Sequence, residues 1–321
     1  MNRVIVIFIL QLLALPQVFS QDWIVFNKGN SGVPDNLIKT VNIDSSGNVW
    51  FVTGDCFYGG NLMKFDGTTF TKYDSLNSGI RDKFVTCIEF DTYAQTWVGT
   101  RNTGLFVYGG LKWINYNTTN SEMPDKHVTT IAVDKKNVLW VGTDNGLLRF
   151  DSEKNLWKVF KKTNSGLPNN QINAVALDSS GTPWIATDDG LVKYDGKTWT
   201  VYNTANSKLT DNKVNHIAVD KQQNVWVSFW GGVAKISGST WTVYTPQNSK
   251  LPLYCEYTVT IDKTNVKWIT SNMGLVKFDD KDWTLYSPAN SNIADYFLNK
   301  VVVDKKNFKW IASQNGLIKM K

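Results

Sequence analysis

The chain has 321 residues, of which 42% are hydrophobic, 13% aromatic and 19% charged. This composition supplies a packed core and excludes both a disordered chain and a coiled coil. The 14 Trp, 12 Tyr, 16 Phe and 23 Gly favour many short strands joined by tight turns. The net charge of +6 is distributed along the chain and the cations are nearly all Lys, so we expect no nucleic-acid partner.

The chain begins with a segment typical of a signal peptide. Arg3 is followed by an apolar run that starts at Val4, and Ser20 ends the segment. The run contains about a dozen residues, whereas a membrane span needs roughly 20, so a membrane anchor is disfavoured. We predict a signal peptide at residues 1–20, a mature chain from Gln21, and a periplasmic or secreted protein without a membrane span.

Three series of residues recur through the rest of the chain at intervals of 42 to 47 residues. The first series is Trp50, Trp97, Trp140, Trp184, Trp226, Trp268 and Trp310. The second is Trp23, Phe70, Trp113, Trp157, Trp199, Trp241 and Trp283, and the third is Asn30, Asn77, Asn120, Asn164, Asn206, Asn248 and Asn290. A period of this length, without helical periodicity, is typical of a β-propeller blade. The sequence predicts an all-β fold in one domain over residues 21–321: a seven-bladed β-propeller of four-stranded antiparallel blades.

The fourth repeat illustrates the expected strands. Residues 173–177 alternate as an inner strand, and residues 183–187, 191–194 and 199–202 supply the next three. Turn residues separate them. We expect the Trp of the second strand in each blade, such as Trp184, to lie in the core between neighbouring sheets.

An Asp precedes each of these tryptophans by six residues, as Asp178 precedes Trp184. We expect its carboxylate to cap the turn between the first two strands of the blade. No Glu follows at the position that a calcium-binding loop requires, so we expect no metal site. We expect no cofactor either.

The two ends of the chain complement each other. The last repeat stops at Lys321, after its third strand, while an extra strand from Trp23 to Phe26 precedes the first complete repeat. We predict that this N-terminal strand pairs with the C-terminal blade, which closes the ring and hides both sheet edges.

The repeated pattern G-L-x-K-(F/Y)-D-G-x-x-W-x-x-Y, followed by N-S-x-L-P and D-x-x-G-x-x-W, resembles the two-component regulator propeller repeat. It is represented by residues 164–187 and 190–206, while Phe70 and Phe229 depart from it. Longer members of that family are extracellular sensors of hybrid histidine kinases that perceive oligosaccharides. This sequence shows one propeller and neither the sandwich domain nor the kinase. The resemblance therefore implies an exported binding or scaffolding propeller of a Gram-negative bacterium, and it names no ligand.

We expect a ligand at the mouth of the central channel, on the face that carries the loops between blades and the loops between second and third strands. Three departures from the repeat fall on this face: an expanded loop in the first blade, an aromatic turn in the fifth and an irregular entry to the sixth. The residues concerned are Phe57 and Tyr58, then Trp230, then Tyr254, Glu256 and Tyr257.

The departures in the fifth and sixth blades, together with His216, predict a binding site in one sector of the mouth. Aromatic rings stack on the apolar faces of sugars, and a carboxylate accepts hydroxyl or amide hydrogens. An oligosaccharide or an amphipathic peptide is the expected ligand. The alternative is that Trp230 fills a local gap and Glu256 pairs with a nearby Lys.

Two further features lie near the same face. Arg101 is a candidate for binding an anionic group, with a solvated surface residue as the alternative. Cys56 and Cys87 fall on adjacent blades, so a disulfide that fixes the expanded loop is a hypothesis, which leaves Cys255 free.

An enzyme is the weaker interpretation. The chain has only His127 and His216 and no established catalytic motif. Streptogramin lyase is also a seven-bladed propeller, and here only His216 with Glu256 forms a candidate pair for proton abstraction. We expect a monomeric, non-enzymatic module that binds a ligand or another protein. The alternatives are a structural component of an envelope complex or, less favoured, a streptogramin-lyase-like enzyme.

Overall fold

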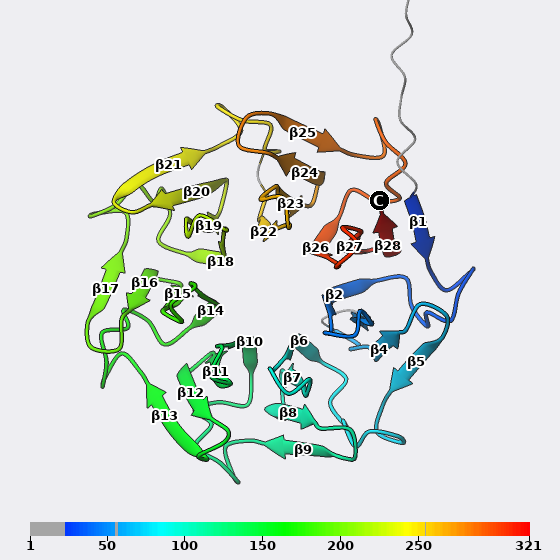
Figure 1. Ribbon diagram of the computed structural model, residues 1–321, viewed down its shortest axis with the longest axis horizontal. Coiled ribbons are helices and arrows are strands. Elements are labelled where there is room, and N and C mark those ends of the chain that lie inside the picture. The colour runs from blue at the N-terminus through cyan, green and yellow to red at the C-terminus, as the bar shows by residue number, and fades with distance from the viewer. Residues whose placement is uncertain (1–22, 55–56, 254) are drawn as a thin grey trace, which may run out of the picture.

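The computed structural model describes residues 23–54, 57–253 and 255–321. In these ranges every regular element is a β-strand, and the strands form seven antiparallel sheets of four arranged as a ring (Figure 1). The predicted seven-bladed β-propeller is confirmed. Within these ranges no helix is long and apolar enough to cross a membrane.

Blades 1 to 6 contain four consecutive strands each, from β2–β5 to β22–β25, and blade 7 contains β26, β27, β28 and β1. In each blade the strands follow one another from the axis of the ring outward (Figure 1). The strands of the first half are β1 (Trp23–Phe26), β2 (Ile38–Ile43), β3 (Val49–Thr53), β4 (Leu62–Phe65), β5 (Phe70–Tyr73), β6 (Val85–Phe90), β7 (Thr96–Thr100), β8 (Leu105–Tyr108), β9 (Trp113–Tyr116), β10 (Val128–Val133), β11 (Val138–Thr143), β12 (Gly146–Asp151), β13 (Leu156–Phe160) and β14 (Ile172–Leu177). The remaining strands are β15 (Pro183–Thr187), β16 (Gly190–Tyr194), β17 (Trp199–Tyr202), β18 (Val214–Val219), β19 (Val225–Phe229), β20 (Gly232–Ser237), β21 (Thr240–Tyr244), β22 (Thr258–Ile261), β23 (Lys267–Ser271), β24 (Gly274–Phe278), β25 (Trp283–Tyr286), β26 (Leu298–Val303), β27 (Lys309–Ser313) and β28 (Gly316–Met320).

The N-terminal strand closes the ring as predicted. Strand β1 pairs antiparallel with β28, with Trp23 opposite Met320 and Phe26 opposite Leu317. The hydrogen-bonding edge of β28 is therefore covered by the other end of the chain.

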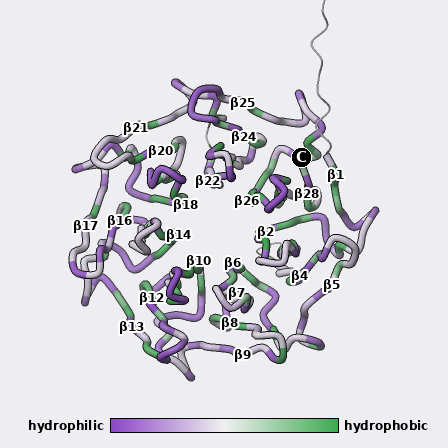
Figure 2. The backbone as a smooth tube through the Cα atoms, viewed as in Figure 1, coloured by the Kyte–Doolittle hydropathy of each residue, from purple (hydrophilic) through white to green (hydrophobic). Residues whose placement is uncertain are grey.

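The second strand of each blade carries a Trp that is buried between two blades. Trp226 stacks on Tyr244 of its own blade, with ring centroids 5.8 Å apart, and meets Phe278 of blade 6 edge-on at 6.0 Å. At about 25 cal/mol per Å² of buried apolar area, each such ring contributes about 4 to 6 kcal/mol as an upper bound. Hydrophobic residues follow the inner strands, while the loops at the rim are largely hydrophilic (Figure 2).

The Asp before each Trp caps the turn between the first two strands, as expected. In blade 6, Asp262 Oδ1 accepts the backbone N–H groups of Thr264 and Val266 at 2.8 and 3.0 Å. Its Oδ2 also accepts the Nε1–H of Trp268 at 2.9 Å, a bond that the sequence did not reveal. Five blades make this indole bond, whereas the buried Nε1 atoms of Trp140 and Trp184 have no partner among the described residues.

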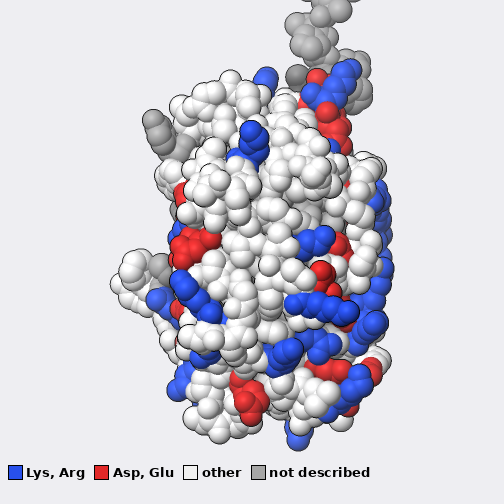
Figure 3. All heavy atoms as spheres, turned by 90° about the vertical axis from the view of Figure 1, so that its left-hand side faces the viewer, with Lys and Arg blue, Asp and Glu red and all other residues white. Residues whose placement is uncertain are grey.

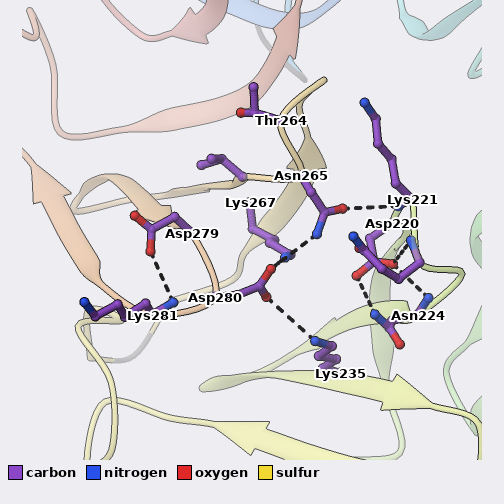
Figure 4. Close-up of polar contacts among 12 residues, drawn as sticks. Asp220, Lys221, Asn224, Lys235, Thr264, Asn265, Lys267, Asp279, Asp280 and Lys281 are labelled. Atoms are coloured by element: carbon purple, nitrogen blue, oxygen red, sulfur yellow. Dashed lines mark hydrogen bonds and ion pairs between the residues drawn. The ribbon is translucent and has the colours of Figure 1, made fainter.

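An unusual buried cation joins blades 5 and 6. Lys267 is 0% exposed, and its Nζ bonds Oδ2 of Asp280 at 2.5 Å while lying 5.0 Å from the centre of the Trp226 ring. Lys235 approaches the other oxygen of Asp280 at 3.7 Å. Figure 4 shows both lysines directed at this one carboxylate. Asp280 therefore neutralises a charge that has no access to water.

We predict that Asp280→Asn lowers the free energy of unfolding by about 2 kcal/mol or more, because it leaves the buried Lys267 ammonium without its counter-charge. Urea unfolding followed by circular dichroism measures the change. Asn tolerates the positive φ of 74° found at Asp280, so the backbone is not additionally strained. The double variant Lys267→Met with Asp280→Asn should recover most of the loss, and a single variant as stable as the wild type would refute this role.

Candidate functional site

Blades 5, 6 and 7 enclose a cavity of about 470 Å³. Four of the predicted site residues lie in its wall: Trp230, Glu256, Tyr257 and His216. The other lining residues are Asn215, Thr258, Thr270, Asn272, Phe297, Leu298 and Asn299. Tyr254, also predicted here, lies outside the described residues. The convergence of the two adjacent repeat departures in one hollow is thus found in the structure.

Trp230 is placed by the turn between β19 and β20. The following residue, Gly231, has a φ of +77°, and its N–H donates to the carbonyl of Cys255 at 3.3 Å, which ties the turn to blade 6. Gly232 is required for packing, because a Cβ there would lie 2.5 Å from the ring of Phe229. Trp230 itself remains 52% exposed. A tight, anchored turn therefore presents a large aromatic ring to solvent at the edge of the cavity.

Glu256 and Tyr257 point in different directions. Glu256 is exposed, whereas the side chain of Tyr257 is only 1% exposed and donates its hydroxyl to the carbonyl of Pro252. Burial raises the pKa of the Tyr257 phenol. Tyr257 lines the cavity but is almost fully buried, so it supports the wall and offers no exposed ring there. Strand β22 begins two residues later than the corresponding strand β18, so Tyr257 lies in an irregular segment directly before the strand.

His216 projects from the inner strand β18. Its Nδ1 accepts the backbone N–H of Val259 at 3.4 Å, and burial, reinforced by the nearby Lys300, lowers its pKa to about 4. The imidazole is therefore neutral at pH 7. Among the described residues no hydrogen bond joins His216 to Glu256, although both line the same cavity.

Phe297 is a cavity residue that the sequence analysis missed. It lies directly before β26 and is 47% exposed, so it offers a second ring beside Trp230 in the same cavity. The corresponding position is occupied by different residue types in other blades, such as Lys213 and His127. The repeat therefore gave no contrast from which Phe297 could be recognised.

A second hollow of about 400 Å³ at the mouth of the channel is lined by residues of six blades that lie in the inner strands or directly before them. It shares Asn215 and Glu256 with the first cavity, so the two are adjacent. His127 belongs to it, and His127 Nδ1 lies 2.6 Å from Oδ2 of Asp144. Asp144 also accepts the side-chain amide of Gln171 at 2.7 Å. This ordered imidazole–carboxylate pair was not predicted, because its partners are far apart in sequence.

The remaining candidates lie elsewhere. Phe57 and Tyr58 are exposed on the blade 1 loop and Arg101 is exposed on blade 2, and none lines either cavity. Cys56 lies outside the described residues, so the proposed disulfide remains a hypothesis. Cys87 has a free thiol in the structure.

The thiol of Cys87 on β6 packs closely against Gly99 of the neighbouring strand. Its Sγ lies 2.5 Å from the position that a Cβ of Gly99 on β7 would take, and burial raises the pKa of the thiol to about 11. Among the described residues no group of three or more His, Cys, Asp or Glu is arranged to hold a metal ion.

Residues 122–145 match the family model of the two component regulator propeller. The match confirms the resemblance that the repeats predict, and it falls on the loop and first two strands of blade 3. Comparison with curated proteins gives no match.

Solved structures with similar folds come from proteins of different functions. The extracellular domain of a putative one component system from B. thetaiotaomicron is 19% identical with a TM-score of 0.72, over 94% of this chain and 40% of that one. PorZ of Porphyromonas gingivalis, a surface component of the type-IX secretion system, is 17% identical with a TM-score of 0.72, over 92% and 48%. Virginiamycin B lyase of Staphylococcus aureus is 14% identical with a TM-score of 0.73, over 94% and 99%. This chain thus spans less than half the length of the first two, and similarity at this level establishes the fold alone.

We predict that His216 contributes to the pH dependence of stability. Its folded pKa lies below the ordinary value of 6.5, so the unfolded chain binds more protons between pH 6.5 and 4, and stability falls as the pH falls through this range. The contribution is at most about 3 kcal/mol. Urea unfolding at pH 7 and at pH 4 measures this contribution, and His216→Phe should make the difference in unfolding free energy between the two pH values smaller. Identical pH profiles for wild type and His216→Phe would contradict the assignment.

Proposed function

We propose that this protein is an exported, non-enzymatic propeller that binds a carbohydrate or a peptide at the mouth of its channel. The observation that carries the proposal is the cavity between blades 5 and 7, in which two half-exposed aromatic rings, Trp230 and Phe297, face the same hollow as the carboxylate of Glu256.

The chemistry of this cavity suits a polar ligand with apolar faces. Aromatic rings bind the C–H faces of a sugar or an apolar side chain of a peptide, with little loss of conformational freedom. Three asparagines in the wall, Asn215, Asn272 and Asn299, supply amide donors and acceptors. A volume of about 470 Å³ is within the usual range for small-ligand sites.

Export is supported by the apolar N-terminal segment of the sequence and by the extracellular origin of the similar regulator domains. A non-enzymatic role is supported by the same domains. A lyase is the less favoured alternative. It is favoured by the similarity of fold to virginiamycin B lyase. It is also favoured by the His127–Asp144 pair, which has the imidazole–carboxylate arrangement of a general base.

A role in an envelope assembly is the second alternative, with an envelope protein as partner. The similarity of fold to PorZ, which is described as a bacterial surface component of the type-IX secretion system, is the observation that favours it. In that case the exposed rings of Trp230 and Phe297 would contact a protein.

We predict that Trp230→Ala and Phe297→Ala each weaken the binding of the preferred ligand about tenfold or more, because each removes a stacking surface. The ligand is found by titration calorimetry against a panel of neutral oligosaccharides and peptides. Tyr58→Ala, which removes an exposed ring outside the cavity, is the matched control and should bind as the wild type does.

Ligands whose affinity is the same in wild type and both cavity variants would refute the proposed site. The enzymatic alternative requires a substrate that the wild type turns over and His127→Ala does not. The assembly alternative requires co-purification with a defined envelope complex that is lost in Trp230→Ala.

A further inference from the structure

The opposite face of the propeller, formed by the turns between first and second strands and between third and fourth strands, carries a separate cavity. It lies between blades 3 and 4 and measures about 450 Å³. Four cations line it: Lys135, Lys136, Arg149 and Lys158. Positive charge is distributed along the sequence, yet the fold gathers many Lys and Arg side chains at one edge of the molecule, which is the right-hand edge in Figure 3.

The repeats themselves show how an equivalent groove is filled. In blade 3, Arg149 on β12 stands opposite Trp140, as Lys235 on β20 stands opposite Trp226 in blade 5. By the same register, Gly196 in blade 4 corresponds to Asp280 in blade 6. The groove between blades 3 and 4 is therefore the counterpart of the groove between blades 5 and 6.

The two grooves differ at two positions. Between blades 5 and 6, the carboxylate of Asp280 lies between two cations, with Lys267 Nζ at 2.5 Å and Lys235 Nζ at 3.7 Å. Between blades 3 and 4, Gly196 supplies no carboxylate and Pro183 replaces the lysine. Among the described residues Arg149 forms no ion pair.

The groove between blades 3 and 4 carries more positive than negative side chains, so it can bind an anion. Its four cations exceed its two carboxylates, Asp134 and Asp195, and both carboxylates are engaged, each through Oδ1, by two backbone N–H groups. Of the cations, Lys135 donates to the carbonyl of Ser179 at 3.2 Å. Trp140 is only 5% exposed, lines the cavity, and has an Nε1–H without an acceptor in the described part of the chain.

Two of the cations are held by aromatic rings. The Arg149 guanidinium lies 6.0 Å from the centre of the Trp140 ring, and Lys158 Nζ lies 5.0 Å from the centre of the Phe160 ring. These rings hold the two cations against the wall of the cavity. A guanidinium fixed in this way can bind both oxygens of a carboxylate.

We propose that the cavity between blades 3 and 4 binds a small ligand through its carboxylate, which occupies the place that the Asp280 side chain occupies between blades 5 and 6. The volume accommodates a ligand of monosaccharide size. Sugar acids and simple organic acids share the required group, and binding measurements distinguish them. This site is independent of the cavity at the channel mouth, so either proposal can fail without the other.

The test uses titration calorimetry of the full chain at low ionic strength with D-glucuronate, acetate and D-glucose as probes. The proposal expects glucuronate to bind and the neutral sugar glucose not to bind. If acetate and glucuronate bind with equal affinity, the cavity is a general carboxylate site. If glucuronate binds more tightly than acetate, the cavity is a sugar-acid site. Failure of both acids to bind, at concentrations up to tens of millimolar, would overturn the proposal.

The most informative variant is Gly196→Asp, which supplies the missing carboxylate from the protein itself. Asp280 shows that Asp is accepted at this turn position with a φ of 74°, and a Cβ on Gly196, whose φ is 96°, meets nothing within 4 Å. We expect Gly196→Asp to weaken glucuronate binding at least tenfold. Gly196→Asn, of equal size but neutral, should weaken it less.

Two further variants control for charge and strain. Gly67 is the corresponding residue of blade 1, with a φ of 103° and open space at its Cβ, so Gly67→Asp adds the same charge and strain elsewhere and should bind glucuronate normally. Arg149→Gln should also lose at least tenfold in affinity. Thermal unfolding confirms that each variant is folded, and wild-type affinity in folded Gly196→Asp and Arg149→Gln would exclude this site.

Discussion

The pairing of β1 with β28 is the constraint on which the rest of the structure depends. Every blade buries one side of its sheet against the next blade, and seven hydrophobic clusters occupy the seven junctions. The cluster between blades 7 and 1 joins Trp310 and Leu317 to Phe51 and Met63, residues from opposite ends of the chain. An open ring would expose this cluster and the edge of β28 together, so closure and core packing are one requirement.

Because the seven blades are built alike, we expect the specificity for a ligand to come from the positions at which the blades differ. The buried Trp and the capping Asp recur in every blade and carry no information about a ligand. Trp230 and Phe297 stand outside these series and face one cavity, while Gly196 and Asp280 occupy the same turn with opposite consequences. In one groove the protein supplies its own carboxylate, and in the other the corresponding space is open. The two candidate sites lie on opposite faces of the ring.

Repetition explains why so much of the fold could be predicted from the sequence. Strand positions, blade number, the burial of Trp184 and its equivalents, and the closing strand all follow from residues that recur in register. The repeat register also predicted that Trp230, Glu256 and His216 lie together at the mouth of the channel. The burial of Tyr257 did not follow from the repeat, because this residue stands in the irregular segment directly before β22. Phe297 and the His127–Asp144 pair were missed because side-chain directions in loops depend on neighbours that the repeat does not specify.

Closure is tested most directly by calorimetric unfolding of the chain with and without the strand Trp23–Phe26. The account predicts that deletion of these four residues lowers the midpoint of the cooperative transition by about 10 °C or more, because several kcal/mol of burial and four strand pairings are lost. A deletion variant that unfolds at the same temperature as the full chain would show that the ring does not depend on its N-terminal strand.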